Sequence, residues 1–375
     1  MAKPLNLFIL AGEPSGDRIG ADLVERLKTR TELTLTGVGG EALTQSGLKS
    51  EFNMNELSVM GWADVLPRLP KLLWRARQVA QKIIRTRPDV AVLIDAQVFS
   101  AIVAGQVQKA APDIPVVLYV APAVWAWKPE RAAKLTPKFR EVLSVLPFEP
   151  EFMRTVGGPE TTYVGHPALT RFPLRAAVPE QGPVLLLPGS REGELRRHLP
   201  LMRAVAEQLK GHQRVTGFVL PTPRSLEARV RAEVSGWNAP VEVVTGEESK
   251  AKAFREAVAA AAVTGTVTLE LALAGVPMAT TYVADKGQAK RWVQYKVKFA
   301  SLPNAILDRT LVPEVLQVEP QPDALVAEVR CLLDDRAMAD AQVIGFGEMR
   351  QLMEQGTPAA PRVDPADRVM RYARG

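Results

Sequence analysis

The segment AGEPSGD, residues 11–17, places two carboxylates, Glu13 and Asp17, on a glycine-rich loop directly behind the apolar run LNLFIL. Glycine-rich loops after a first strand usually hold phosphates, which acidic neighbours repel. Carboxylates instead accept hydrogen bonds from hydroxyl groups, so hydroxyl ligands are expected here. The alternative is a capped strand–turn–helix junction, with Ser15 as the N-cap and Asp17 in the first helical turn. That alternative gives no role to Glu13.

A third carboxylate, Asp95, closes the apolar run VAVLIDA. Open α/β sheets bind ligands at the carboxyl ends of their strands, so Asp95 and the AGEPSGD loop are expected on one edge of a sheet. Burial there would raise the pKa of Asp95 toward the range of a general base. The alternative is an aspartate that caps the next helix. Neither interpretation needs a metal, because His166, His198 and His212 have no metal-ligand spacing.

Two segments in the second half of the chain carry groups suited to a nucleotide diphosphate. In LLLPGSREGELRRHL, Arg191 stands at the expected start of a helix, where a cation and free backbone N–H groups bind phosphate. In VTGTVTLELALAGVPM, Gly265 and Thr266 enter a helix. Glu270 follows one turn later, where its carboxylate can accept hydrogen bonds from a ribose diol. Each segment also fits a purely structural junction, but together they favour the nucleotide-binding half of a two-domain glycosyltransferase.

Short apolar, β-branched runs alternate with helical segments along the chain, which predicts a layered α/β fold built on parallel sheets. The runs are LNLFIL, LTLTGV, VAVLID, PVVLYV and VLSVL, and later VLLLP, VTGFVLP and VEVVT. A proline-rich stretch at residues 166–184 is the best linker candidate. We therefore expect two Rossmann-like domains, residues 1–172 and 180–345. Helices follow in 346–375, and the sequence leaves their packing open.

The composition limits the cellular compartments and the binding partners that are expected for the protein. The single cysteine, Cys331, excludes an internal disulfide framework and fits a reducing cytoplasm. The net charge of +6 favours an anionic partner, which is a membrane surface, a nucleic acid or a phosphorylated substrate. Trp125 and Trp127 stand beside basic residues in VAPAVWAWKPERAAK. They either pack on sugar or base faces or belong to a helix-entry turn with buried indoles.

Two basic amphipathic stretches, residues 61–85 and 284–299, have the pattern of helices that lie on a membrane surface. In the first stretch, apolar side chains at helical spacing lie among lysines and arginines. The expected membrane-contact residues are Trp62, Val65, Leu66, Leu69, Leu72, Leu73 and Trp74. The alternative is a helix that faces the core and exposes a solvated basic face.

Nine motifs occur in the order seen in lipid-A-disaccharide synthases, which the chain resembles over about residues 5–318. They are AGEPSGD, ELSVMGWADVLPRLPKLL, LIDA, VWAWKPERAAK, LPFEPEF, YVGHP, LLPGSR, TGTVTLELALAGVPM and SLPN. The resemblance implies a GT-B glycosyltransferase, in which two Rossmann-like domains with parallel sheets face each other across a cleft. It also implies UDP-2,3-diacylglucosamine as donor and 2,3-diacylglucosamine 1-phosphate as acceptor. They would be joined β-1,6 by an enzyme bound peripherally to the cytoplasmic face of the inner membrane.

The resemblance further implies an inverting displacement without a metal or other cofactor. Asp95, the aspartate of LIDA, would deprotonate the acceptor 6-hydroxyl. The nucleotide-binding residues would be Arg191, Gly265, Thr266, Glu270 and Asn304, the last supplied across a homodimer in one version of the hypothesis. The acceptor cleft would be lined by Glu13, Ser15, Gly16 and Asp17.

Some positions depart from the family's usual sequence. Gln97 and Val98 follow LIDA in place of Pro-Asp, Ala121 and Ala123 replace two serines, and Val283 replaces an arginine. These changes leave room for a diverged GT-B glycosyltransferase or a UDP-sugar epimerase that acts on another UDP-N-acetylglucosamine-type substrate. A basic nucleic-acid-binding protein is a third interpretation, but the sequence contains no recognised RNA- or DNA-binding motif.

Overall fold

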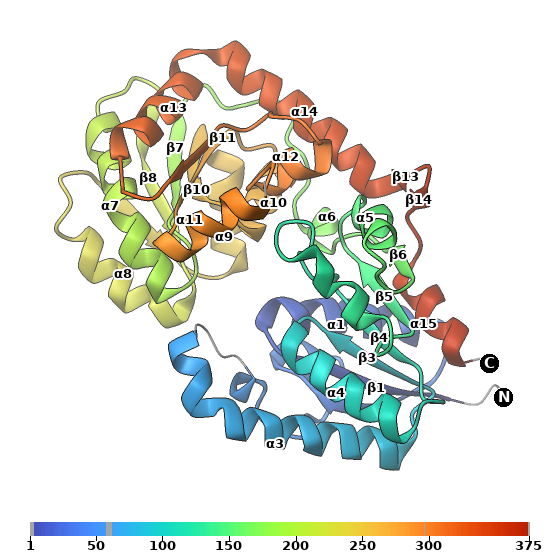
Figure 1. The fold of residues 1–375 in the computed structure, drawn as a ribbon. Coiled ribbons are helices and arrows are strands. Elements are labelled where there is room, and N and C mark those ends of the chain that lie inside the picture. The colour runs from blue at the N-terminus through green and yellow to red at the C-terminus, as the bar shows by residue number, and fades with distance from the viewer. Residues whose placement is uncertain (1–3, 58–61, 296, 374–375) are drawn as a thin grey trace. The chain divides into compact units, whose positions relative to one another are not determined.

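Figure 1 shows the computed structural model of the chain, which describes residues 4–57, 62–295 and 297–373. Of residues 62–68, 286, 291–293, 295 and 373 only the backbone is described. The chain divides into two compact units. Unit 1 comprises Met1–Pro167 together with Met353–Gly375, and unit 2 comprises Ala168–Leu352.

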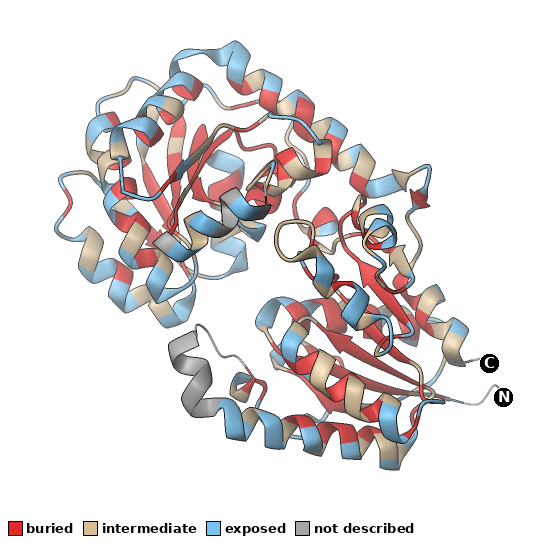
Figure 2. Cartoon of the chain, viewed as in Figure 1, coloured by how far each residue is buried: buried red, intermediate tan, exposed pale blue. Residues whose placement is uncertain are grey.

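In the described part of unit 1, six parallel strands form one sheet in the order β2-β1-β3-β4-β5-β6. The central strands are continuous apolar runs because helices cover both faces of the sheet. Figure 2 shows these strands as buried. The strands are β1 (Leu5–Ala11), β2 (Leu33–Val38), β3 (Val90–Ile94), β4 (Val116–Tyr119), β5 (Glu141–Ser144) and β6 (Thr161–Tyr163).

The helices of unit 1 pack in two groups, α1 with α15 and α3 with α4. The long helix α3 turns one apolar side inward, with Ala76, Val79, Ala80 and Ile83 buried. The helices are α1 (Pro14–Lys28), α2 (Glu41–Gln45), α3 (Trp62–Thr86), α4 (Gln97–Ala110), α5 (Glu149–Thr155) and α15 (Pro365–Ala373). Single 3₁₀ turns lie at Met54–Glu56, Pro129–Arg131 and Ala133–Leu135.

The described part of unit 2 holds a second six-stranded parallel sheet, in the order β12-β11-β10-β7-β8-β9. Its core combines strand residues such as Val184 and Phe218 with the apolar sides of α7 and α13. The strands are β7 (Gly182–Leu187), β8 (Val215–Pro221), β9 (Val241–Val244), β10 (Ala259–Val263), β11 (Met278–Val283) and β12 (Glu314–Gln317).

The helices of unit 2 include the short α6 before the first strand and the long α14 that leads back toward unit 1 in sequence. They are α6 (Ala168–Arg171), α7 (Glu192–Leu209), α8 (Glu227–Val234), α9 (Glu247–Glu256), α10 (Thr266–Leu273), α11 (Lys286–Tyr295), α12 (Leu302–Leu307), α13 (Pro322–Asp334) and α14 (Arg336–Gln355). A 3₁₀ turn of unit 2 lies at Arg224–Leu226. After α14 the chain is again in unit 1, where β13 (Gly356–Thr357) and β14 (Ala360–Pro361) form a small hairpin.

Each sheet has one topological switch point, where the strand order reverses direction. In unit 1 the reversal lies between β1 and β3, and in unit 2 between β7 and β10. At such a point the chain leaves two adjacent strands toward opposite faces, and a crevice opens at their carboxyl ends. Open α/β sheets bind their ligands there, so the segments that follow these four strands are the first candidates for a functional site.

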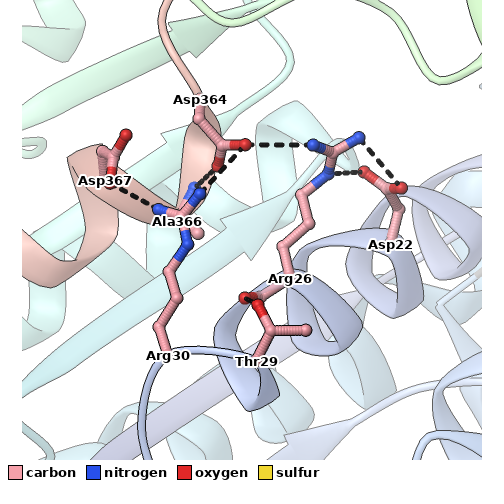
Figure 3. Close-up of polar contacts among 7 residues, drawn as sticks. All are labelled: Asp22, Arg26, Thr29, Arg30, Asp364, Ala366 and Asp367. Carbon is pink, nitrogen blue, oxygen red and sulfur yellow. Dashed lines mark hydrogen bonds and ion pairs between the residues drawn. The ribbon is translucent and has the colours of Figure 1, made fainter.

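The segment after Met353 returns to unit 1 and docks on α1. Figure 3 shows Arg26 between Asp22 and Asp364, with its Nη1 3.0 Å from Asp364 Oδ2. Arg30 pairs with Asp364 at 3.2 Å and with Asp367. The other contacts are with Glu141 on β5. Its buried carboxylate accepts hydrogen bonds from Arg368, Tyr372 and Thr162. These contacts show that α15, the last helix, packs on unit 1.

The division between the units lies at Pro167, a few residues before the expected end of the first domain at residue 172. The contacts of α6 explain the difference. Arg171 pairs with Glu270, and the guanidinium of Arg350 donates to the carbonyls of Leu169 and Phe172. All of these partners belong to unit 2, so α6 is part of that unit.

Candidate active site

The loop after β1 and the loop after β3 lie against each other at the switch point of unit 1. Ala11 is level with Ile94 in the sheet. A Cβ added to Gly12 would lie 2.5 Å from the Cβ of Ala96, and one added to Gly16 would lie 3.3 Å from Ile94 Cγ2. Two glycines of AGEPSGD therefore permit a close approach that larger residues would prevent. The sequence prediction that this segment and Asp95 share one sheet edge is confirmed.

Asp95 sits on a strained backbone. Its φ is 55° and that of the next residue, Ala96, is 42°, so two consecutive non-glycine residues adopt the left-handed conformation. The segment is held in place because the Asp95 N–H donates to the Tyr119 carbonyl at 3.0 Å and the Asp95 carbonyl accepts from Ser100 Oγ at 2.8 Å. Val120, which follows the adjacent strand β4, has a φ of 76°. Such strain gathers at functional sites, where the surrounding structure maintains it.

The structure corrects the capping interpretation of AGEPSGD. Helix α1 begins at Pro14 with Glu13 as its N-cap residue, so Ser15 is not the N-cap. Proline suits this first position because its fixed φ is already helical and its missing N–H is not needed there. Asp17 does lie in the first turn, as expected.

The Asp17 carboxylate bonds to backbone amides within unit 1. It is buried, and its Oδ1 accepts from the Gly40 N–H at 2.6 Å while its Oδ2 accepts from the Ala42 N–H at 2.8 Å. The Leu43 N–H adds a longer contact to Oδ1. The carboxylate therefore satisfies the first amides of α2 and joins that helix to α1. Of the residues expected in an acceptor cleft, the half-buried Glu13 and the exposed Ser15 keep side chains available, and Gly16 serves the packing of the loop.

A buried acid that the sequence analysis did not select lies beyond β5. Glu149 is 3% exposed, and desolvation raises its pKa to about 8. Its carboxyl accepts a hydrogen bond from the Leu146 N–H at 3.2 Å, and the neighbouring Phe148 ring meets the Trp125 indole edge-on at 5.3 Å. A neutral acid thus holds the turn at the end of β5. The signal in the sequence was Glu149 between Phe148 and Pro150 in LPFEPEF, directly after the apolar run VLSVL.

The switch point of unit 2 brings the two predicted nucleotide segments together. Leu187 at the end of β7 is level with Ala262 of β10, so the turns that follow these strands are neighbours. Arg191 is the N-cap residue of α7 and its side chain is half exposed. The Glu194 carboxylate accepts from the Ser190 N–H at 2.8 Å and lies 3.7 Å from Arg191 Nη1. A cation and a helix N-terminus thus meet at one edge.

The Gly265–Thr266 turn has the geometry of a close backbone approach. Gly265 has φ 152° and ψ −166°, a conformation that essentially only glycine adopts. Nothing lies within 4 Å of the position its Cβ would occupy, and Thr266 is exposed as the first residue of α10. The turn is fixed by Thr268, whose Oγ1 donates to the Gly265 carbonyl at 2.7 Å. The first amides of α10 have no partner within the helix and follow this open turn, an arrangement that suits anion binding.

Glu270, one turn into α10, is held by two cations. It is 8% exposed, and its Oε1 lies 3.1 Å from Arg171 Nη2 while its Oε2 contacts Lys250 Nζ. Arg171 also pairs with Glu247 at 3.1 Å. The three residues Arg171, Lys250 and Glu270 are called the Glu270 triad below. The carboxylate that was predicted to receive a ribose is present at the switch point, and the sequence analysis missed both of its cationic partners.

Comparison with known proteins decides the family. A family model described as lipid-A-disaccharide synthetase matches residues 7–362. A lipid-A-disaccharide synthase of Rhodopseudomonas palustris is 40% identical over 382 residues, which cover 98% of this chain and 97% of that protein. One from Bradyrhizobium diazoefficiens is 39% identical over 381 residues and 98% of this chain.

The chain belongs to the lipid-A-disaccharide synthase family.

Solved structures agree on the fold of this family member. A UDP-GlcNAc 2-epimerase from Neisseria meningitidis matches with a TM-score of 0.61 at 11% identity, covering 93% of this chain and 98% of that one. MurG of Acinetobacter baumannii matches with a TM-score of 0.56 at 14% identity, covering 99% and 100%. At these identities the likeness concerns the fold alone. The GT-B fold and the family resemblance predicted from the sequence are confirmed.

Asn304, the asparagine of the motif SLPN, bonds within unit 2. It is fully buried, and its Nδ2 donates to the Val312 carbonyl and to Glu314, each at 2.8 Å. Its Oδ1 accepts from the Leu311 and Val312 N–H groups. Both amide hydrogens and the carbonyl oxygen are thus used within unit 2, which makes Asn304 a residue that shapes the segment between α12 and β12.

The positions that depart from the family lie in different settings. Val98, in the first turn of α4 beside Asp95, is 67% exposed. Ala121 is buried and Ala123 is exposed. Val283 belongs to the core of unit 2, and its N–H donates to Nε2 of the buried His198. Desolvation lowers the pKa of His198 to about 4, so this imidazole is a neutral link between α7 and β11.

The predicted membrane-contact residues lie on α3. Leu69, Leu73 and Trp74 are exposed, with Trp74 at 56%, and Leu72 is half buried. The side chains of Trp62, Val65 and Leu66 lie outside the described residues, as do several from the stretch 284–299. Lys71 and Arg75 pair with Glu56, which ties α3 to the preceding segment. No helix within the described residues is long and apolar enough to span a membrane.

Metal-ligating side chains do not cluster in the described part of the chain. No group of three or more His, Cys, Asp or Glu side chains there is placed to hold a metal ion. Both ring nitrogens of His198 bond to the backbone. Its Nδ1 donates to the Glu194 carbonyl at 2.8 Å, and its Nε2 accepts from the Val283 N–H.

Proposed function

We propose that this family member transfers a diacylglucosamine unit from its UDP carrier to diacylglucosamine 1-phosphate and releases UDP. The observation that carries the proposal is the strained, tightly held Asp95 at one switch point, in a chain whose second switch point has a glycine-threonine turn and a ribose-competent glutamate. Family membership favours glycosyl transfer over the epimerase alternative, because the epimerases resemble this chain in fold alone.

The reaction is a single displacement at the anomeric carbon of the donor. The Asp95 carboxylate accepts the proton of the acceptor 6-hydroxyl as its oxygen attacks that carbon. The carbon–oxygen bond to the diphosphate breaks, UDP leaves with the bonding electron pair, and the configuration inverts to give the β-1,6 linkage. The left-handed backbone of Asp95 and Ala96 fixes where the carboxylate points, which supports its role as the base.

Unit 2 supplies the groups for the leaving nucleotide. The first amides of α10 and the half-exposed Arg191 stabilise the negative charge that grows on the diphosphate. Glu270 accepts hydrogen bonds from the ribose hydroxyls. Glu13 and Ser15 of AGEPSGD contact the acceptor sugar, while Asp17 and Asn304 shape their segments from within.

The substrates carry acyl chains, so the enzyme works at the membrane surface. The exposed apolar face of α3, formed by Leu69, Leu73 and Trp74, enters the interface between headgroups and acyl chains. The exposed Arg77 and Lys71 on the same helix attract anionic lipids. This arrangement supports peripheral binding to a membrane surface, which we propose is the inner face of the inner membrane.

The test is product formation by the purified protein. Incubation with both acyl sugars is expected to release UDP and to yield one disaccharide per UDP, detected by mass spectrometry. Donor alone should release little UDP, and UDP-N-acetylglucosamine should not be converted to its 2-epimer. Epimerisation without disaccharide formation would overturn the proposal.

A further inference from the structure

The Glu270 triad is more elaborate than a structural ion pair requires. A buried carboxylate needs compensation by hydrogen bonds or cations, and one partner can supply both oxygens when an arginine binds in two-pronged fashion. Here each oxygen has its own cation, Arg171 at Oε1 and Lys250 at Oε2. The cations come from α6 and α9, so three separate elements of unit 2 fix the plane of one carboxylate.

Lys250 itself is held on an aromatic platform. Its Nζ lies 5.6 Å from the ring centroid of Phe254 and 5.8 Å from that of Phe172, and the two rings stack at 5.4 Å. Ammonium groups within about 6 Å of a ring face are attracted to it. The side chain is 20% exposed, which is low for a lysine. The ammonium is therefore positioned before any ligand arrives.

The triad leaves hydrogen-bonding capacity on the carboxylate for a diol, and the Glu270 side chain is 11% exposed. A carboxylate oxygen accepts about two hydrogen bonds. With one cation at each oxygen, each still has capacity for one hydroxyl donor, and the two vicinal hydroxyls of a ribose match a pair of oxygens. Glu270 lies one helical turn after the Gly265–Thr266 turn, so the proposed ribose and phosphate contacts come from the same helix, α10.

We propose that Lys250 is a positioning residue that orients the Glu270 carboxylate toward the two ribose hydroxyls of the nucleotide. This inference rests on the proposed function. Without Lys250, Glu270 turns both oxygens to the guanidinium of Arg171, because the paired geometry is the stronger alternative. The carboxylate then no longer meets both hydroxyls, while the contacts of the diphosphate with Arg191 and α10 are unaffected.

The experiment compares two ligands by titration calorimetry, UDP and 2′,3′-dideoxy-UDP, which lacks both hydroxyls. Wild-type protein is expected to bind UDP about 10-fold or more tightly than the analogue, since hydrogen bonds to a charged acceptor are worth that factor. Lys250→Met should reduce this preference to about 3-fold or less. Its affinity for the dideoxy analogue should equal that of the wild type.

Three further variants guard the interpretation. Lys250→Arg keeps a cation and should retain most of the preference. Lys250→Gln replaces the ammonium with a shorter, neutral amide and should lose the preference even if Lys250→Met fails to fold. Lys252→Met is the matched control on the same helix, since Lys252 is 67% exposed and contacts only Glu256 at 4.0 Å among the ion pairs of the described residues. It should bind both nucleotides like the wild type.

Two outcomes overturn the inference. Equal weakening of both nucleotides in the Met and Gln variants means that the triad only maintains the fold, and an unchanged preference means that Lys250 does not act on the diol. Wild-type protein that binds neither nucleotide would overturn the proposed function itself, and the inference with it.

Discussion

Gly12 packs so closely on Ala96 that a Cβ on the glycine would lie 2.5 Å from the Cβ of the alanine. The contact joins the first loop of unit 1 to the loop that carries Asp95. Real Cβ atoms do not approach this closely, so one of the two loops must move when Gly12 is enlarged.

Gly12→Ala is therefore expected to displace Asp95 and to reduce kcat by roughly 100-fold, since a displacement of about 1 Å costs this much in a positioned reaction. The measurement is the rate of UDP release with both substrates. Gly211→Ala is the control, because nothing lies within 4 Å of the Cβ position of Gly211. Full activity of the Gly12 variant would show that the contact does not position Asp95.

Asp95→Asn removes the proposed base and leaves the shape of the side chain. We expect kcat to fall by about 10²- to 10⁴-fold, the usual contribution of general base catalysis, with the Kd for UDP unchanged. The control is Asp113→Asn, which alters an exposed aspartate of the same unit that pairs with Arg87. A kcat within about threefold of wild type would assign the base to another group.

Leu73→Ser combined with Trp74→Ser should weaken binding to vesicles that contain anionic phospholipid. Burial of two large apolar side chains contributes enough free energy that a loss of about 10- to 100-fold is expected. Sedimentation with vesicles measures the effect. Ile344→Ser is the matched control, because Ile344 is 67% exposed on α14 in unit 2. Equal loss in the control, or none in the double variant, would argue against α3 as the contact surface.

Arg368→Met leaves the carboxylate of Glu141 buried without its cation. Glu141 is fully buried, and Arg368 Nε donates to its Oε1 at 2.8 Å. Removal of one partner of a buried pair typically costs about 3–5 kcal/mol, so the free energy of unfolding should fall by that amount. Arg309→Met breaks a half-exposed pair with Glu348 and should cost about 1 kcal/mol or less. Neutralising both partners with Arg368→Met and Glu141→Gln should recover part of the loss.

Glu149 makes the stability of unit 1 fall as the pH rises. Burial raises its pKa from the ordinary value of 4.5 to about 8 in the folded protein, so the folded state keeps a proton that the unfolded state releases. Stability is therefore lost as pH rises from about 4.5 to about 8. Glu149→Gln removes this linkage and should be more stable than wild type by roughly 4 kcal/mol at pH 8, with a much smaller difference at pH 5. Denaturant titrations at both pH values measure it, and parallel pH profiles of the two proteins would contradict the assignment.

The strands that could be predicted are those with a strong local signal. LNLFIL and LTLTGV became β1 and β2 because branched and aromatic side chains favour buried parallel strands. β10 was not among the runs selected, since Ala259–Val263 is four alanines and a valine, a composition with low strand preference. Its five residues are all buried, and its pairing with β7 on one side and β11 on the other makes it a central strand of the sheet.

Site residues were predictable by type and position but not by partner. Gly265 and Asp95 follow strands that the order of the sheets brings to switch points, and a pattern of strands suggests such positions. The side chains of Asp17 and Asn304 are equally suited to bind a ligand, yet both bond to backbone amides. The amides bound by Asp17 are 23 or more residues away, and those bound by Asn304 are 7 or more residues away. Lys250 and Arg171 reach Glu270 from separate helices, and no local pattern reveals such a meeting.

The return of residues 353–375 to unit 1 has a consequence for synthesis. A ribosome makes most of unit 1 first, yet Glu141 and Arg26 wait for Arg368 and Asp364, which are made after the whole of unit 2. During that interval the Glu141 carboxylate has neither the cation of Arg368 nor the hydroxyl of Tyr372 that bind it in the finished chain. Unit 2 can complete its own contacts earlier, so the order in which the units mature is the reverse of the order in which they begin.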